Sequence, residues 1–136
     1  MIDFNELEDA FSFVSSDQPF LNSAIVNKKT GEIFYRSELS GIDDFPENFE
    51  DEDFIEIPHK NELDLGSDLV FDFIATHLPQ RLEEVDRIFR ARGAYRRFKS
   101  LLESVGLLEE WYRFEDERTK SALRQWCKDN DLQIKE

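Results

Sequence analysis

The hydrophobic positions of the chain follow two spacings, one typical of helices and the other typical of strands. Near the start, Leu7, Ala10, Phe11 and Val14 share one face of a short helix, and acidic residues occupy its other face. Pro19 follows shortly afterwards and ends this element, since proline lacks the backbone N–H that a helix needs. The pattern therefore predicts an amphipathic helix close to the N-terminus.

Three short segments, residues 20–26, 32–36 and 54–57, contain the β-branched and aromatic residues typical of strands. The first two are separated by a turn-forming run that ends in Gly31, a residue that readily adopts positive φ. We therefore expect a β-hairpin there. Pro58 ends the third segment, and a long acidic connection separates it from the second. Together the segments predict a small three-stranded antiparallel meander.

The second half of the chain is predicted to be helical. Pro79, Gly93 and Gly106 separate four stretches in which apolar residues recur every three or four positions. The short connections imply that each helix packs against its neighbours in the sequence. The expected fold class is α+β, with an N-terminal helix and the meander followed by a helical C-terminal half of about four helices.

The composition supports one folded domain over residues 1–136. Of the 136 residues, 40% are hydrophobic, and they include 13 Phe. A disordered chain of comparable charge would lack these aromatic residues, and a chain of this length can bury a core without covalent cross-links. The single cysteine excludes both an internal disulfide and a cysteine-rich metal cluster.

The charge of −14 is distributed unevenly along the chain. Residues 1–68 carry 18 acidic and 4 basic side chains, whereas residues 69–136 carry 13 of each. We therefore divide the expected domain into an acidic helix-plus-meander part (1–68) and a charge-balanced helical part (69–136). The overall acidity argues against a protein that coats nucleic acid or an anionic membrane.

The start of the chain lacks the basic residues and the apolar run of a secretory signal. No apolar run elsewhere approaches the ~20 residues of a membrane-spanning helix. Because a lone cysteine also fits a reducing compartment, we expect a cytoplasmic protein that does not associate with membranes.

The stretch between Arg36 and Lys60 contains nine acidic residues and no basic one, and Phe45, Phe49 and Phe54 punctuate it. Acidic and aromatic side chains together can dock on a basic partner or imitate the phosphate backbone of DNA. The simpler alternative, which we favour, is a solvated loop that its Phe side chains pin to the core. The stretch lacks the ligand spacing and the glycine of a calcium loop. The candidate acidic patch comprises Glu50, Asp51, Glu52 and Asp53.

The basic segment, residues 87–99, contains six basic residues and no acidic one. It can hold a phosphate, a nucleic-acid backbone or an acidic partner. Ion pairs within the protein are the interpretation we favour, because Glu83 and Asp86 each precede an arginine by four residues on a helix. Direct nucleic-acid contact is the weaker alternative, since the acidic charge of the protein opposes it. The candidate basic patch comprises Arg92, Arg96, Arg97 and Lys99.

Glu115 falls within the apolar stripe of the last predicted helix, if residues 108–126 form one continuous helix. A buried carboxylate without a partner is costly. Either the helix breaks near Phe114, or Glu115 pairs with a cation, for which Arg97 and Arg118 are the candidates. We expect a buried ion pair between Arg97 and Glu115, with a structural rather than a catalytic role.

The remaining residues offer little chemistry. His59 and His77 share no metal-ligand spacing with each other, and Cys127 is predicted to be a packing residue. The sequence contains no phosphate-binding loop, dinucleotide fingerprint or nucleophile elbow. We therefore expect no catalytic residue, no metal site and no cofactor.

Two motifs in the second half are distinctive. They are Gly93-Ala94-Tyr95-Arg96-Arg97-Phe98-Lys99 and Trp111-Tyr112-Arg113-Phe114, which are followed by Trp126 and preceded by Thr30-Gly31 and Ile57-Pro58. With these motifs the chain resembles a bacterial uncharacterised protein family, number 0158 of the uncharacterised series, from about residue 20 to about residue 134. The resemblance implies a bacterial single-domain α+β protein and supplies no activity, cofactor or catalytic residue.

The sequence as a whole favours a non-enzymatic regulatory or protein-interaction module that binds another protein through its acidic and basic surfaces. One alternative is a nucleic-acid-linked protein, either a DNA mimic through the acidic stretch or a protein whose arginines contact RNA or DNA. A third hypothesis is a small enzyme, which would need a pocket where Arg97, Tyr112, Glu115 and a histidine meet.

Overall fold

The computed structural model describes all residues from 1 to 136, and the chain divides into two compact units. Unit 1 contains Met1–Leu63 and Ser121–Glu136, whereas unit 2 contains Asp64–Lys120. Unit 2 is therefore inserted, in sequence, between two parts of unit 1. The α+β class is confirmed, because unit 1 holds the sheet and unit 2 is helical.

Helix α1 (Phe4–Ser15) opens unit 1 and has the predicted apolar face. Its N-terminus is capped by Asp3, whose carboxylate accepts hydrogen bonds from the backbone N–H groups of Asn5 and Glu6. The helix packs against the sheet, where Phe13 contacts Tyr35 edge to face at a ring separation of 5.1 Å. One face of the sheet is therefore covered by α1.

The sheet contains strands β2 (Asn22–Asn27), β3 (Ile33–Ser37) and β4 (Phe54–Glu56), which pair antiparallel in the order β3-β2-β4. The hairpin of β2 and β3 is confirmed, and Gly31 in its turn has a φ of +77°. The meander connection is wrong, because β4 pairs with β2 rather than with β3.

The reason for this strand order lies in the segment that follows β3. Residues 42–44 return along the free edge of β3, where the N–H of Ser37 donates to Ile42 and the N–H of Asp44 donates to Tyr35. Because that edge is already hydrogen-bonded, the third strand pairs with the other edge of the hairpin.

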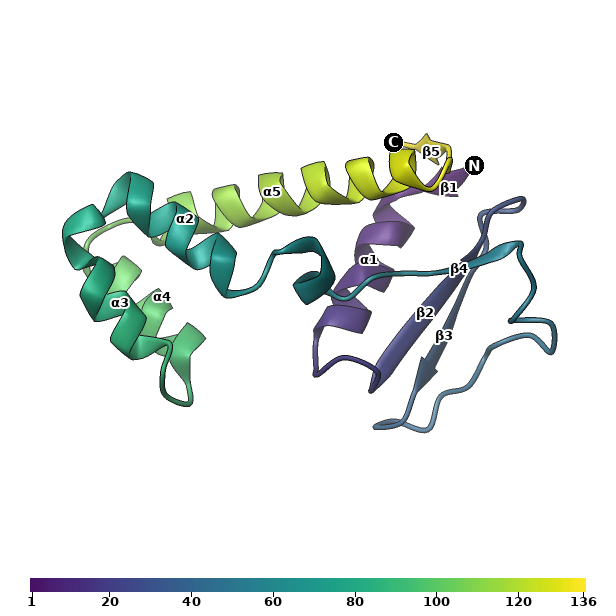
Figure 1. The fold of residues 1–136 in the computed structure, drawn as a ribbon, viewed down its shortest axis with the longest axis horizontal. Helices are drawn as coiled ribbons and strands as arrows, with labels where there is room; N and C mark the ends of the chain where they lie inside the picture. The colour runs from purple at the N-terminus through teal and green to yellow at the C-terminus, as the bar shows by residue number, and fades with distance from the viewer. The chain divides into compact units, whose positions relative to one another are not determined.

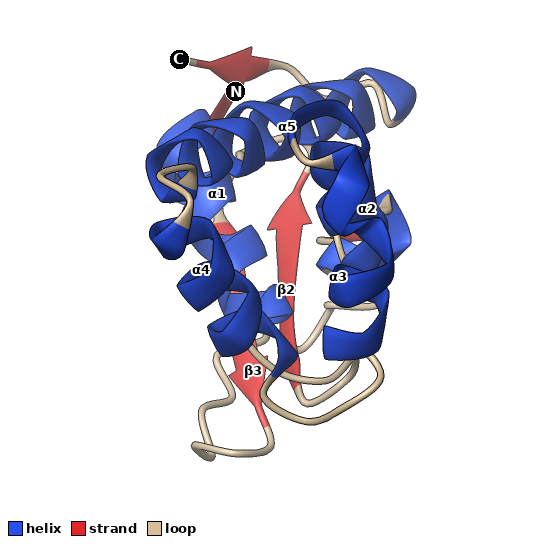
Figure 2. Cartoon of the chain, turned by 90° about the vertical axis from the view of Figure 1, so that its left-hand side faces the viewer, coloured by secondary structure: helices blue, strands red, loops and turns tan.

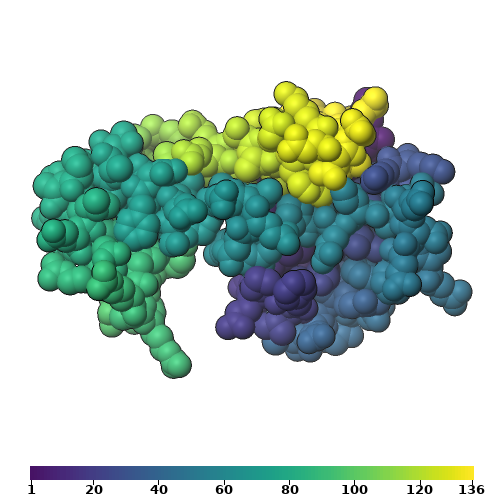
Figure 3. Space-filling model, in the orientation of Figure 1, coloured from purple at the N-terminus to yellow at the C-terminus, as the bar shows by residue number.

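Two very short strands join the ends of the chain. Strand β1 (Ile2–Asp3) pairs in parallel with β5 (Ile134–Lys135), and the N–H of Ile2 donates to the carbonyl of Gln133 at 2.9 Å. The space-filling view shows the last residues beside the first (Figure 3). The sequence pattern did not predict this pair, because two residues are too few to show an alternation.

The segment after β4 is tied to α1 by polar contacts. His59 is buried, and its Nε2 lies 2.7 Å from the carbonyl oxygen of Asp17. The N–H of Lys60, at the start of the 3-10 helix η1 (Lys60–Leu63), donates to the hydroxyl of Ser15 at 3.0 Å. These contacts hold the end of α1 against the chain that leaves the sheet (Figure 1).

Unit 2 consists of helices in series, as predicted. They are α2 (Ser67–His77), the short 3-10 helix η2 (Pro79–Arg81), α3 (Leu82–Ile88) and α4 (Ala94–Ser104), followed by the first part of α5 (Leu108–Asp129). Figure 2 shows α2, α3 and α4 as separate short helices. None of the helices combines the length and the apolar composition needed to cross a bilayer.

Aromatic rings form the core of unit 2. Trp111 is 1% exposed, and its ring centre lies 5.0 Å from that of Phe98 and 5.4 Å from that of Phe73. Phe114 contacts Phe73 at 5.3 Å, and Phe89 contacts Phe98 at 5.7 Å. Because Phe98 belongs to α4 and Trp111 to α5, these contacts fix the helix that carries Arg96, Arg97 and Lys99.

Candidate interaction surfaces

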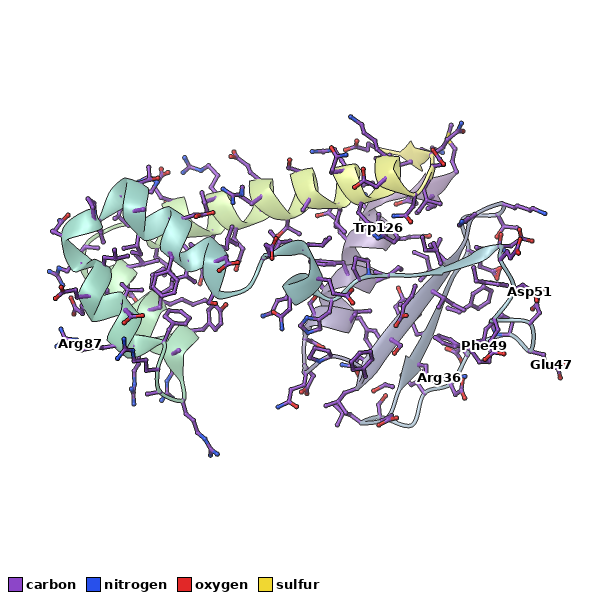
Figure 4. The ribbon with its side chains drawn as sticks, in the orientation of Figure 1. Arg36, Glu47, Phe49, Asp51, Arg87 and Trp126 are labelled. Atoms are coloured by element: carbon purple, nitrogen blue, oxygen red, sulfur yellow. The ribbon has the colours of Figure 1, made fainter.

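Arg36 organises the face of the sheet that α1 leaves uncovered. It lies on β3 and pairs with Asp43 at 3.1 Å, within the segment that returns along the strand edge. The guanidinium carbon lies 4.2 Å from the ring centre of Phe45 and 4.8 Å from that of Phe49. The two rings contact each other at 5.5 Å. Figure 4 shows Arg36 and Phe49 near one another beyond the strands.

The acidic loop, residues 38–53, is held by its Phe side chains, but not to the core as the favoured interpretation expected. The loop is pinned to Arg36 on the open face of the sheet, and not to the core between α1 and the sheet. Sequence reasoning missed Arg36 as the anchor. The available signal was a single basic residue placed directly before a long run of acidic and phenylalanine residues.

A hollow of about 490 Å³, which we call the Arg36 groove, lies on the same face. Ile25, Phe45, Phe49 and Phe54 form apolar parts of its wall. Its polar lining includes Arg36 and two acidic residues, Glu50 and Glu56. The groove therefore combines aromatic rings with carboxylates.

Most of the candidate acidic patch is exposed around this groove. Asp53 forms an ion pair with Lys29 at 3.3 Å, and Asp51 accepts a hydrogen bond from the side chain of Asn48. Glu50 and Glu52 are exposed and have no hydrogen bond or ion pair. Figure 4 shows Glu47 and Asp51 at the outside of the loop. The loop thus presents carboxylates that the chain itself does not neutralise.

The basic segment pairs internally much less than predicted. Asp86 and Arg90 form the expected pair at 2.6 Å, but Glu83 and Arg87 do not pair. Lys99 lies over the ring of Tyr112, with 5.6 Å between its ammonium nitrogen and the ring centre. The side chains of the remaining four are exposed and make no hydrogen bond or ion pair. We call these four the unpaired arginines: Arg87, Arg92, Arg96 and Arg97.

The other six arginines of the chain all have carboxylate partners. Three of them also lie over an aromatic ring, so that a ring and a carboxylate hold one guanidinium together. These three are Arg36 with Asp43 and Phe45, Arg118 with Asp72 and Phe114, and Arg124 with Glu136 and Phe4. The unpaired arginines have neither kind of partner.

The position of Arg96 does not favour the stability of its own helix, α4. Gly93 precedes α4 with a φ of +73°, and no side chain caps the helix there. Arg96 lies in the first turn, where a positive charge opposes the positive end of the helix dipole. Figure 4 shows Arg87 extending outward from α3. The dipole of α4 therefore does not explain why residue 96 is an arginine, whereas Arg87 lies in the last turn of α3, where a positive charge is favourable.

The buried ion pair expected between Arg97 and Glu115 is not formed as a buried pair, because the Arg97 side chain is exposed. Glu115 is half-buried on α5, which is one continuous helix, so the alternative of a break near Phe114 is wrong. Burial and the Glu115 carboxylate raise the pKa of Tyr95. Arg96 is exposed, whereas Lys99 is half-buried beside Tyr112.

The two hollows of unit 1 are lined by residues other than the candidate chemical residues. A second hollow, of about 350 Å³, is lined by acidic residues and Tyr35, whose pKa is raised by burial and by Asp9 and Glu6. Neither hollow is lined by a histidine, Arg97, Tyr112 or Glu115. His77 stacks on Phe73 of its own helix, at 4.3 Å between ring centres.

Cys127 is 1% exposed, as expected for a packing residue, and burial raises the pKa of its thiol to about 11. A thiol with a raised pKa is mostly protonated near neutral pH and is a poor nucleophile. Cys127 therefore contributes packing rather than reactivity.

Comparison with known proteins identifies a family that matches nearly the whole chain and a relative that matches part of it. The family model described as "Uncharacterised protein family (UPF0158)" matches residues 1–135. A Pseudomonas aeruginosa protein named "UPF0158 protein PA5073" is 34% identical over 56 residues, which span 40% of this chain and 37% of that protein. The match thus covers well under half the length of this relative. No solved structure matches the chain.

Proposed function

The chain belongs to the Uncharacterised protein family (UPF0158), as the motifs around Gly93 and Trp111 indicated. We propose that it is a non-enzymatic, cytoplasmic protein-interaction module. Its basic segment binds an acidic stretch of a partner protein. A binding module is also what the sequence favours over an enzyme or a nucleic-acid-linked protein.

The observation that carries the proposal is the clustering of the unpaired arginines. All four lie between residues 87 and 97, whereas every arginine outside this range has a carboxylate partner. A guanidinium offers several N–H donors in a fixed plane, which match a carboxylate in a two-point contact. Four such groups with no internal partner form a surface suited to an acidic segment.

Aromatic side chains of the same unit add apolar contact area. Tyr95 is 36% exposed and Tyr112 is 46% exposed. Lys99 lies between them, since it follows Tyr95 by one helical turn and its ammonium lies over the Tyr112 ring. Arginine and tyrosine are the residue types that most often dominate binding energy at protein interfaces. An acidic partner segment with apolar residues therefore fits this surface better than a uniformly acidic polymer does.

The test is capture of partners from a bacterial lysate with the wild-type chain and an Arg96→Ala/Arg97→Ala variant. Both residues are exposed and unpaired, so the variant keeps its fold and loses only part of the docking surface. We expect one or more acidic proteins to be captured by the wild type and lost from the variant. Identical partner sets would contradict the proposal.

A matched control removes the same amount of charge elsewhere. Lys128 and Lys135 are exposed in unit 1 and make no ion pair, so Lys128→Ala/Lys135→Ala should capture the wild-type partner set. The purified wild type is also titrated with duplex DNA and with RNA. Salt-sensitive binding to either polymer that disappears in Arg96→Ala/Arg97→Ala would replace the proposal with the nucleic-acid alternative.

A further inference from the structure

We infer that the Arg36 groove is a second binding surface, specific for guanidinium groups, and that it receives the unpaired arginines of a second copy of this chain. The contact joins the groove of one copy to the basic segment of another, so the chain associates head to tail. This inference rests on the proposed role of the basic segment as a docking surface.

The Arg36 groove lies on the face of the sheet that α1 leaves uncovered. Side chains alternate along a strand, so Ile25, Phe34 and Phe54 point away from the face that packs on α1. Phe34 and Phe54 contact each other at 6.0 Å, and Phe54 lines the groove. Arg36 already occupies the rings of Phe45 and Phe49. Phe54 therefore supplies an aromatic surface that no cation of the chain occupies.

The carboxylates of the groove are also unoccupied. Glu50 and Glu56 both line the hollow and are exposed. Neither carboxylate has a hydrogen bond or an ion pair. Two basic residues of the neighbouring β2–β3 hairpin, Lys29 and Arg36, are already paired with Asp53 and Asp43. A cation that enters the groove therefore meets two carboxylates that have no competing partner.

Three arginines of the chain show that a guanidinium suits a site made of a carboxylate and an aromatic ring. Arg36, Arg118 and Arg124 each combine a carboxylate with an aromatic ring, at 4.2 to 5.1 Å between guanidinium and ring centre. Beside the Arg36 guanidinium, the groove supplies the same two components, the ring of Phe54 and the carboxylates of Glu50 and Glu56, for a second guanidinium. A planar guanidinium stacks on a ring and forms two-point contacts with carboxylates, which the ammonium of lysine does not.

The unpaired arginines supply the missing component. They are exposed, they lie within eleven consecutive residues, and they lack both a carboxylate and a ring. The charges are complementary, because the acidic loop has no basic residue and the basic segment has no acidic one. Complementary charge of this kind raises the association rate and fixes the orientation of two partners. A second copy therefore fits the groove better than a partner with a neutral surface.

A head-to-tail contact of this kind joins two different surfaces, so each copy has one of each left to bind a further copy. The first experiment is sedimentation velocity of the purified wild type over a range of concentrations, at about 50 mM and about 500 mM NaCl. We expect species larger than a dimer at low salt and at least a tenfold weaker association at high salt. A wild type that stays monomeric at every concentration at low salt would overturn the inference.

The decisive experiment uses two variants that each lose one surface. Glu50→Lys/Glu56→Lys keeps the basic segment and loses the groove carboxylates, whereas Arg96→Glu/Arg97→Glu keeps the groove and loses half of the unpaired arginines. Each variant alone should be monomeric. An equimolar mixture should form a one-to-one complex and nothing larger, because only one productive contact remains. A mixture that stays monomeric would overturn the inference.

Circular dichroism checks that both variants fold, which is expected because all four substituted side chains are exposed. A control with the same change in charge outside the groove, Glu38→Lys/Asp129→Lys, should associate like the wild type. Loss of association in this control would show a general charge effect and would count against the groove. A monomeric wild type that still captures acidic partners from lysate would remove the self-association and leave the proposed function standing.

Discussion

The acidic loop and the basic segment are the two most highly charged stretches of the chain, yet the protein treats them differently. In the loop region, Arg36 is held by Asp43 and by the rings of Phe45 and Phe49, so a cation fixes the loop to the sheet. In the basic segment, four arginines face solvent over an aromatic core and have no partner. The first region uses a cation to build the fold, and the second leaves its cations available.

The local surroundings of a charged side chain, and not the run of charges in the sequence, decide whether it pairs within the fold. Asp43 meets Arg36 because a tight return of the chain after β3 places residues 42–44 along the strand edge. No comparable return follows α3 or α4, where the breaks at Gly93 and Gly106 lead directly into the next helix. The four unpaired arginines there therefore meet no returning segment that carries a carboxylate, and only Arg90 of the basic segment is paired, with Asp86 of α3.

The largest effect on stability should come from a change in the aromatic core beneath the basic segment. Phe98 is fully buried on α4 and contacts Trp111, so Phe98→Ala should lower the free energy of unfolding by about 3 to 5 kcal/mol. Urea unfolding followed by fluorescence of Trp111, in a Trp126→Phe background, measures this. Phe20→Ala is the control, because Phe20 is 80% exposed and the same chemical change there should cost less than about 0.5 kcal/mol.

The next effect concerns the cation that the fold uses. Arg36→Ala removes one partly exposed ion pair and two ring contacts, so it should lower the free energy of unfolding by about 1 to 2 kcal/mol. Arg36→Lys keeps the charge and loses the planar stacking, and it should give an intermediate value. If Arg36→Ala proved as neutral as a substitution in the basic segment, the contrast between the two regions would disappear.

A third test uses the pH dependence of stability to probe the burial of Cys127, which belongs to unit 1 and not to unit 2. The thiol has a pKa of about 11 in the fold against an ordinary value of 9.0, so the folded state retains its proton where the unfolded chain loses it. Stability from this group is complete below about pH 9 and falls as pH rises toward 11. Between pH 8 and pH 10 the loss should be roughly 1 kcal/mol.

The measurement for this test is urea unfolding of the wild type and of Cys127→Ala at both pH values. The variant should have a shallower pH dependence, whatever its stability at pH 8. Equal slopes for the two proteins would show that the thiol is not protected by burial.

The smallest effect on stability should come from the residues with the largest proposed effect on binding. Arg96→Ala/Arg97→Ala removes exposed, unpaired side chains, one of them in the first turn of α4. The free energy of unfolding should change by less than about 0.5 kcal/mol and, if anything, increase, since helix N-termini disfavour cations. A clear loss of stability in thermal or urea unfolding would mean that the arginines serve the fold after all.

Much of the fold could be predicted from the sequence because the elements have strong local signals. The apolar face of α1, the turn at Gly31 and the helix breaks at Pro79, Gly93 and Gly106 all act within a few residues. The position of β4 could not be predicted, because it depends on hydrogen bonds between residues 42–44 and β3 across an irregular loop. A spacing pattern does not record such contacts.

The candidate surfaces could be predicted only in part for the same reason. The acidic loop and the basic segment were identified as charge runs, and the local pair of Asp86 and Arg90 followed from helical spacing. The role of Arg36 depends on two rings that lie nine and thirteen residues away in the sequence. Whether an arginine is paired is likewise a property of the folded chain, so the unpaired state of Arg87, Arg92, Arg96 and Arg97 became visible only in the structure.

The pairing of β1 with β5 makes the order of synthesis matter for folding. A ribosome releases all of unit 2 before it releases Ile134 and Lys135, which are the partners of Ile2 and Asp3. Unit 2 can therefore build its aromatic core while the first strand of unit 1 still lacks its neighbour. Ile2 and Asp3 are therefore synthesised before unit 2, and their partners only after it, so unit 1 is begun before unit 2 and completed after it.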